Sequence, residues 1–121
     1  TGTPWIKVNP NYKTINVAVE ENTPNSCLHY FRKMVKLRKE NPVLVYGKYT
    51  LIDKDNPSVY AYTREWNGKT ILVLLNFTSK PATINISTLN TNKAKLLIGN
   101  YSNAASAKNE LRPYEAVVYE L

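Results

Sequence analysis

Two aspartates, Asp53 and Asp55, come closest in this sequence to a motif for binding a metal ion. The Asp-x-Asp pattern begins like an EF-hand calcium loop, which requires glycine at its sixth position and glutamate at its twelfth. The chain has Ser58 and Arg64 at those positions, so we do not predict a calcium site. The two carboxylates share a cluster with Asn and Pro, a composition typical of a solvated turn rather than of an acid–base site.

Other glutamates offer no pair of carboxyl groups for acid–base chemistry. Glu20 and Glu21 precede a predicted helix, where negative charge suits the positive end of the helix dipole. Four more are scattered along predicted strands and suggest no pocket. These are Glu65, Glu110, Glu115 and Glu120. The acidic side chains therefore give no prediction of a catalytic residue.

Cys27 and His29 are the single cysteine and the single histidine of the chain. A thiol near a helix start can have a lowered pKa, but residues two positions apart face different sides of a helix, so His29 is not placed to act on it. We predict a packed thiol, and a histidine with a packing or surface role. These counts leave no zinc cluster or disulfide, and the isolated glycines form no phosphate loop, so we predict neither metal nor cofactor. A lone thiol fits a reducing cytoplasm.

Three aromatic side chains, Tyr60, Tyr62 and Trp66, fall on one face of a predicted strand and could form a platform for a sugar ring. Strands favour aromatic residues for packing in general, so we favour rings packed within the protein. A self-standing β-sandwich that binds carbohydrate is the alternative. Asn-x-Ser/Thr sequons carry little weight in a chain this rich in Asn, Ser and Thr, and they occur at Asn76, Asn85 and Asn100.

Composition places the chain among ordinary globular domains. Its 121 residues are 43% hydrophobic and 21% charged, which allows one domain with a substantial core. No apolar run approaches the roughly 20 residues of a membrane helix. The formal net charge is +7, but the dense basic group lies on the solvent face and last turn of a predicted helix, so we predict no nucleic-acid partner. The group comprises Arg32, Lys33, Lys36, Arg38 and Lys39.

The clearest local element is a helix predicted over residues 24–40. Thr23 suits its N-cap, Pro24 its first position, and Asn41-Pro42 its end. Residues at steps of three and four form a wide apolar stripe, which requires a large partner surface such as a sheet. The stripe comprises Cys27, Tyr30, Phe31, Met34, Val35, Leu37 and Arg38.

From residue 43 the hydrophobic period changes from helical to extended. Strands are predicted over 59–66 and 69–78, joined by Asn67-Gly68, a dipeptide that favours a type I′ hairpin turn. Residues 71–75 are apolar on both faces, which predicts a central strand. Further strands are predicted over 43–47, 48–53, 83–87, 95–98 and 114–121. About seven short strands at this spacing indicate an antiparallel β-sandwich.

Four short runs carry a resemblance that covers essentially the whole chain. They are Thr1 to Tyr12, Lys36 to Lys39 followed by Tyr46-Gly47, Asn76-Phe77-Thr78, and Leu111 to Ala116. In this order and spacing they resemble the C-terminal portion of oligo-1,6-glucosidases, which are α-glucosidases of the α-amylase family of glycoside hydrolases. The opening run itself shows no recognisable helix and looks like the middle of a protein, because it lacks a start Met and is more apolar than a free tail.

The resemblance implies a mainly β fold with two parts. Residues 1–42 would be the last loop and last helix of a (β/α)8 barrel, and residues 43–121 an antiparallel Greek-key β-sandwich called domain C. The parent would cleave terminal α-linked glucose by a retaining mechanism, with its catalytic Asp and Glu upstream of this sequence. A retaining site needs two carboxyl groups about 5 to 5.5 Å apart, and no residue here is predicted to be catalytic.

The same resemblance defines the expected partners. The upstream barrel would cover the helix predicted over residues 24–40 and the opening run around Trp5. Without it, we expect the isolated chain to associate with itself through that helix, because a large bare apolar patch favours association. We expect no membrane partner.

Overall fold

The computed structural model describes residues 2–3, 5–103 and 108–121. Thr1 and Pro4, which belong to the opening run, lie outside the described residues. The chain forms two compact units, Thr1–Lys36 and Leu37–Leu121, and the boundary falls within helix α2 (Cys27–Glu40).

The first unit contains a short 3-10 helix, η1 (Pro10–Lys13), and helix α1 (Val17–Asn22). Each begins at an asparagine whose side chain accepts a hydrogen bond from the backbone, Asn9 from the N–H of Asn11 at 3.2 Å and Asn16 from that of Val19 at 3.0 Å. These caps compensate for the unpaired N–H groups of a helix start. We expected no helix in the opening run, and this was wrong for the last residues of that run, where η1 begins at Pro10.

Helix α2 begins later than predicted. Thr23 closes α1 as its C-cap, and Pro24 belongs to the turn that follows, so the helix starts at Cys27 instead. The Ser26 hydroxyl and the Glu20 carboxylate accept hydrogen bonds at 3.3 Å from backbone N–H groups in the first turn of α2. These two oxygens do the capping that we had assigned to Thr23.

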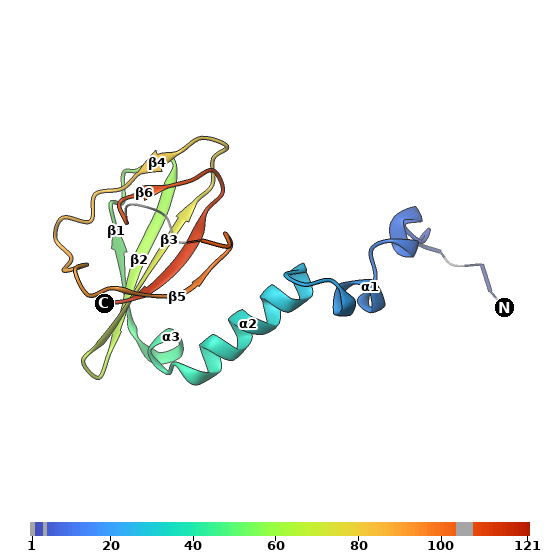
Figure 1. Ribbon diagram of the computed structural model, residues 1–121, viewed down its shortest axis with the longest axis horizontal. Helices are drawn as coiled ribbons and strands as arrows, with labels where there is room; N and C mark the ends of the chain where they lie inside the picture. Colours follow the sequence, from blue (N-terminus) through green and yellow to red (C-terminus); the bar gives the residue numbers. More distant parts are fainter. Residues whose placement is uncertain (1, 4, 104–107) are drawn as a thin grey trace. The chain divides into compact units, whose positions relative to one another are not determined.

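The second unit is an antiparallel β-sandwich (Figure 1). Within the described part of the chain, its larger sheet has the strand order β1-β2-β3-β7-β5, and its smaller layer pairs β4 with β6. The strands are β1 (Lys48–Ile52), β2 (Val59–Trp66), β3 (Lys69–Asn76), β4 (Ala82–Thr83), β5 (Lys95–Gly99), β6 (Glu110–Leu111) and β7 (Ala116–Glu120). The fold class predicted from the sequence is confirmed.

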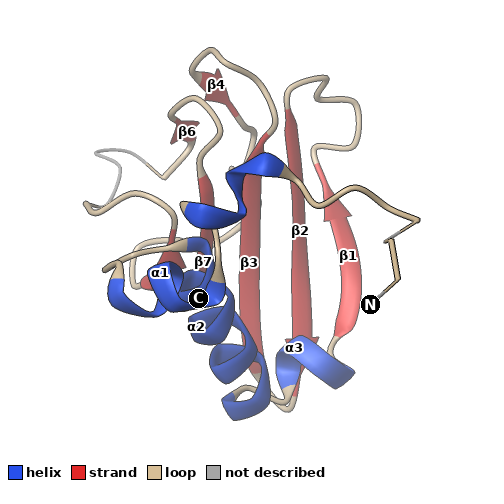
Figure 2. Cartoon of the chain, turned by 90° about the vertical axis from the view of Figure 1, so that its right-hand side faces the viewer, coloured by secondary structure: helices blue, strands red, loops and turns tan. Residues whose placement is uncertain are grey.

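The β2–β3 hairpin and the central position of β3 are also confirmed. Trp66 pairs with Lys69, and the two residues between them have positive φ angles, 49° for Asn67 and 75° for Gly68, as a type I′ turn requires. Strand β3 pairs with β2 on one side and with β7 on the other. Figure 2 shows β3 between these two neighbours.

The two faces of the large sheet carry separate apolar clusters. The inner face and the small layer enclose the main core, which comprises Val59, Ala61, Leu72, Leu74, Ile84, Ile86, Leu111, Val117 and Tyr119. On the opposite side, here called the outer face, Val43, Ile71 and Val73 are buried. Strand β3 contributes to both clusters because its alternate side chains point to opposite faces.

Residues 43–46 form a helix, α3 (Val43–Tyr46), and not the predicted strand. Pro42 has helical backbone angles and starts the turn, and Val43 is then buried against Ile71 and Val73 on the outer face. The helix ends at Gly47, where an added Cβ would lie 2.3 Å from the carbonyl oxygen of Val43. Together with α1, this adds two α-helices to the single one that we predicted.

The strand predicted over residues 83–87 is only partly formed. Strand β4 ends at Thr83, although the Ile84 N–H still donates to the Asn109 carbonyl at 3.0 Å. Ile84 and Ile86 keep the expected alternation and are both buried. Strand β6, which pairs with it, was not predicted because its two residues are too short to show a period. No helix within the described residues is long and apolar enough to cross a membrane.

The core burial generates a stability prediction. We expect Leu74→Ala to lower the free energy of unfolding by about 2 to 5 kcal/mol, because Leu74 is fully buried and its loss leaves a cavity. Leu51→Ala is the matched control, since Leu51 is 42% exposed and should cost less than about 1 kcal/mol. Urea denaturation measures both, and equal effects would contradict this placement of the core.

Candidate functional site

The Asp53 carboxylate holds a loop together. One of its oxygens accepts hydrogen bonds from the side-chain amide of Asn56 at 2.9 Å and from the backbone N–H of Asn85 at 3.1 Å. These bonds, that of Asn56 foremost, lower the pKa of Asp53 below its ordinary value. Asp55 is exposed in the same turn. The structure thus shows the turn that the sequence predicted.

In the first unit, too, acidic side chains have partners within the chain. Glu21 accepts hydrogen bonds from the Arg32 guanidinium at 2.5 and 2.7 Å, and these bonds lower the pKa of its carboxyl group. His29 lies 4.0 Å from the same carboxylate. Cys27 is exposed, because the first turn of α2 presents its side chain to solvent. The prediction of a packed thiol was therefore wrong within this unit.

Glu115 is the exception among the acidic residues, because its side chain is completely buried. It lies in the turn between β6 and β7, three residues after Arg112. The carboxylate accepts hydrogen bonds from the Arg112 backbone N–H at 2.8 Å and from its Nε at 3.0 Å, and it forms an ion pair with Nη2. These Arg112 hydrogen bonds lower the pKa of Glu115 even though burial opposes ionisation.

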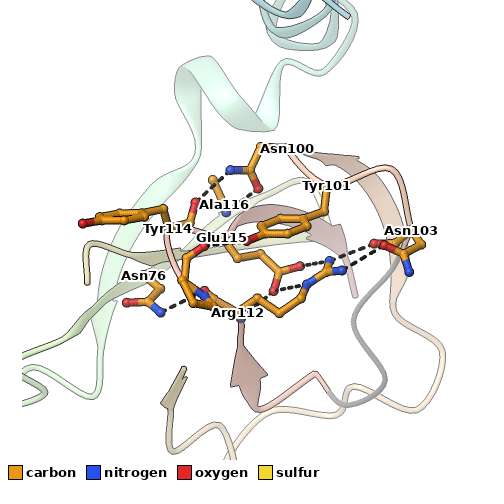
Figure 3. A network of polar contacts seen from close by, with 9 residues as sticks. Asn76, Asn100, Tyr101, Asn103, Arg112, Tyr114, Glu115 and Ala116 are labelled. Carbon is orange, nitrogen blue, oxygen red and sulfur yellow. Dashed lines mark hydrogen bonds and ion pairs between the residues drawn. The ribbon is translucent and has the colours of Figure 1, made fainter. Parts of the chain in front are cut away.

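Arg112 is fixed on its other side as well (Figure 3). Its guanidinium donates to the side-chain oxygen of Asn103 at 2.9 Å and to the backbone carbonyl of Asn103 at 2.8 Å. The Tyr101 ring lies 3.9 Å from the guanidinium carbon, a cation–π geometry, and its hydroxyl donates to the Pro113 carbonyl at 2.8 Å. The side-chain hydrogen bond to Glu115 raises the pKa of Arg112 above its ordinary value.

Two asparagines fix the backbone of the same turn. The Asn76 side chain donates to the Arg112 carbonyl at 2.9 Å, and the Asn100 side chain donates to the Tyr114 carbonyl at 2.7 Å. Asn100 also accepts from the Ala116 N–H at 2.9 Å. Both amide nitrogens are thus engaged within the protein, and Asn76 is buried. We call this set the corner network: Asn76, Asn100, Tyr101, Asn103, Arg112 and Glu115.

Tyr114 lies inside this turn in an unusual backbone conformation. Its φ angle is 53°, whereas the other described non-glycine residues with positive φ are Asn25, Asp53 and Asn67. Asparagine and aspartate tolerate the left-handed region, but a bulky side chain there costs roughly 1 to 2 kcal/mol. The Tyr114 ring is nevertheless 61% exposed.

The corner network was not predicted from the sequence. Glu115 was one of four glutamates expected to be scattered along predicted strands, because the burial of a carboxylate does not show in its sequence neighbours. The available signal was local: Arg112 and Glu115 are three residues apart on either side of Pro113-Tyr114, which is the spacing of a turn closed by an ion pair.

The three aromatic residues predicted on one strand face do share the outer face of β2. Tyr60 and Tyr62 pack on each other, whereas Trp66 packs on Tyr46, so the three rings do not form one flat platform. Tyr62 lies 5.2 Å from Tyr49 and 5.6 Å from Tyr60, with ring planes tilted by 38° and 51°, and Trp66 lies 6.0 Å from Tyr46. The Tyr49 and Tyr60 hydroxyls are 2.9 Å apart, and this hydrogen bond raises the pKa of Tyr49 to about 12.

Surface depressions in the described part of the second unit include two that are lined by residues singled out above. One, of about 420 Å³, is lined by residues of 84–91 with Lys108 and Asn109, and the Lys108 ammonium is engaged by the Thr91 carbonyl at 2.5 Å. The other, of about 310 Å³, lies beside Tyr60 and Phe77. Its Asp53 and Asn56 side chains are already bonded to each other and to the backbone. Among the described residues, no cluster of three His, Cys, Asp or Glu side chains could hold a metal ion.

Comparisons with known proteins match the two ends of the chain to two families. Residues 49–118 match the family described as Maltogenic Amylase, C-terminal domain, and residues 1–47 match the family described as Alpha amylase, catalytic domain. The chain is 44% identical to an oligo-1,6-glucosidase of Parageobacillus thermoglucosidasius and 42% identical to one of Bacillus cereus. These alignments cover 99% and 100% of this chain but only 22% of each relative.

Solved structures show the same relationship. Trehalose-6-phosphate hydrolase of Bacillus licheniformis superimposes with a TM-score of 0.86 at 34% identity, over 98% of this chain and 22% of that one. Trehalulose synthase MutB of Pseudomonas mesoacidophila gives a TM-score of 0.81 at 39% identity, over 99% and 22%. The chain therefore spans about a fifth of the length of the relatives that it matches.

The corner network generates a prediction about pH. The folded protein holds the pKa of Glu115 below its ordinary 4.5, so the unfolded chain binds the proton first and stability is lost as pH falls through the folded pKa. Glu115→Gln should lower the free energy of unfolding at pH 7 by about 1 to 3 kcal/mol. It should also flatten the fall in melting temperature below pH 4.5.

Thermal unfolding followed by circular dichroism from pH 7 to pH 3 measures both effects. Glu110→Gln is the matched control, because Glu110 is exposed, and it should keep the original profile. An unchanged acid limb in Glu115→Gln would show that the buried ion pair does not set the pH dependence.

Proposed function

Because the chain belongs to the family of maltogenic-amylase C-terminal domains, we propose that it is the C-terminal part of an α-glucosidase that supports a catalytic barrel. The whole enzyme would release terminal α-linked glucose from short oligosaccharides by a retaining mechanism. The names of the relatives support the substrate class, and the match of residues 1–47 to a catalytic domain supports the barrel.

The outer face of the large sheet is the observation that carries this proposal. A sandwich needs one apolar core, and here the inner face supplies it. The outer face is apolar as well, with Ile71 and Val73 buried under α3 and several half-buried neighbours: Leu44, Tyr62, Leu75, Leu97 and Val118. An apolar surface of this kind is typical of a docking site between domains.

We further propose that the isolated chain is not catalytic. A retaining glycosidase needs two carboxyl groups about 5 to 5.5 Å apart in a sugar pocket. Three acidic side chains of the chain have structural roles: Glu115 is paired with Arg112, Glu21 with Arg32, and Asp53 with its own loop. The catalytic pair would then belong to the rest of the enzyme.

The boundaries of the two parts remain as proposed from the sequence. Residues 1–42 would complete the barrel, and residues 43–121 would form the supporting sandwich. The cytoplasm is the proposed compartment, because the lone Cys27 is a free thiol.

A graft tests the proposed function. The matched C-terminal segment of the Parageobacillus thermoglucosidasius oligo-1,6-glucosidase is replaced by this chain, and hydrolysis of an aryl α-glucoside is measured. We expect the chimera to be active and the isolated chain to release no product. The same graft made with the Bacillus cereus segment controls for the replacement itself. If that control is active and our chimera is not, or if the isolated chain turns over substrate, the proposal is wrong.

The isolated chain should also associate with itself. Phe31 and Met34 on α2 are 64% and 47% exposed, and a bare apolar patch favours contact with a second copy. We expect the sedimentation coefficient to rise with protein concentration, and the double variant Phe31→Ser, Met34→Ser to reduce this rise. Lys33→Ser, on an exposed position of the same helix, is the control. A monomer at every concentration would refute this part of the proposal.

A further inference from the structure

Tyr114 combines a strained backbone with an exposed aromatic ring. Its left-handed φ of 53° is one that asparagine or glycine adopts more easily, and its ring is 61% exposed. Such conformations persist only where the surrounding structure enforces them, and they cluster at sites that bind or switch. The fold itself would be served as well by glycine at this position, so the ring requires a separate explanation.

The corner network fixes where this ring points. The Tyr114 N–H donates to the Thr78 carbonyl at 3.0 Å, and its own carbonyl accepts from the Asn100 side chain at 2.7 Å. The buried Glu115–Arg112 ion pair closes the turn beneath it. Figure 3 shows the Tyr114 ring directed away from the Arg112 guanidinium, so the network holds the backbone and leaves the ring free.

The ring lies at the end of the sheet where β3 ends and β7 begins. Tyr60, Leu75 and Ala116 are direct partners across β2, β3 and β7, and therefore share one face. Phe77 follows the end of β3 and Tyr114 precedes the start of β7, and the Tyr114 N–H bond to Thr78 places these two segments side by side. Phe77 is 68% exposed and Tyr60 is 42% exposed. Three exposed aromatic side chains from three different segments thus lie at this end of the sheet.

The surroundings favour a protein surface over a sugar as the partner. In the depression beside Tyr60 and Phe77, the Asp53 and Asn56 side chains are already engaged within their own loop. A sugar site would need free polar groups to bind hydroxyls. Exposed aromatic rings on a preorganised backbone are instead typical of the residues that dominate protein interfaces.

We propose that Tyr114 is a preorganised anchor through which the outer face docks on the catalytic barrel. This inference rests on the proposed function. The match of residues 1–47 to a catalytic domain, and the relatives in which this chain accounts for 22% of the length, identify that barrel as the occupant. The strain at Tyr114 keeps the ring in its docking position before the two surfaces meet, so less freedom is lost on docking.

The test compares two variants in two contexts. Tyr114→Gly and Tyr114→Asn remove the ring and relieve the backbone, so the melting temperature of the isolated chain should stay the same or rise. In the active chimera, both variants should lower the melting temperature by at least about 3 °C, because the docked ring is lost. Tyr114→Phe keeps the ring and should behave like the original residue.

Asn67→Gly is the matched control, since Asn67 is exposed and has a similar φ of 49° in a turn. It should leave the chimera unchanged. An active chimera whose melting temperature is insensitive to Tyr114→Gly would overturn the anchor and leave the proposed function standing. If Tyr114→Gly lowers the melting temperature equally in the isolated chain and in the chimera, the ring acts inside the sandwich. That result would also overturn the anchor proposal.

Two further outcomes are distinguishable. If the chimera is inactive while the Bacillus cereus graft is active, the proposed function fails and the anchor fails with it. If millimolar isomaltose quenches the tryptophan fluorescence of the isolated chain, and Tyr114→Gly abolishes the quenching, the ring binds sugar and the anchor proposal is wrong.

Discussion

Strand β3 must be covered on both sides, and the rest of the sandwich follows from this constraint. Leu72 and Leu74 are fully buried on its inner face, while Ile71 and Val73 are buried on its outer face. Each such side chain contributes about 1.5 to 3 kcal/mol when it leaves water. The small β4–β6 layer meets the inner requirement. The outer face needs further covering, because α3 covers only the region around Ile71 and Val73. A sandwich with two apolar faces is therefore suited to being one component of a larger protein.

The corner network has a different role, which is to stabilise a charged side chain in the protein interior. A buried carboxylate is tolerated only when it is paired and fully hydrogen-bonded. Arg112 provides both the opposite charge and the hydrogen bonds that Glu115 needs. Its guanidinium also stacks on Tyr101 and donates a hydrogen bond to Asn103. The cluster joins the end of β3, the start of β7 and the segment after β5 at one point. Its role is to fix geometry in a turn that the local sequence would not hold alone.

Much of the fold could be predicted from local patterns. The Asn67-Gly68 turn and the doubly apolar β3 identified the hairpin and its central strand, and the matched families confirm the resemblance to the C-terminal portion of α-amylase-family glucosidases. Errors occurred where tertiary contacts override local preference. Val43 to Tyr46 is rich in residues that favour strands, yet burial of Val43 against the sheet makes it helical. The burial of Glu115 depends on residues far away in the sequence, such as Asn76, and no local period reveals it.

The position of β7 has a consequence for the order of folding. The β2–β3 hairpin is local, and such hairpins form within about 1 to 10 μs. Strand β7 follows all the other described strands in sequence, yet it lies between β3 and β5. Until Ala116 to Glu120 leave the ribosome, β3 has an unpaired edge and β5 has no neighbour in the sheet. An unpaired apolar edge is a template for aggregation. The nascent chain is therefore most vulnerable just before β7 arrives, and loss of those few residues by premature termination would leave the β3 edge open and β5 without a neighbour.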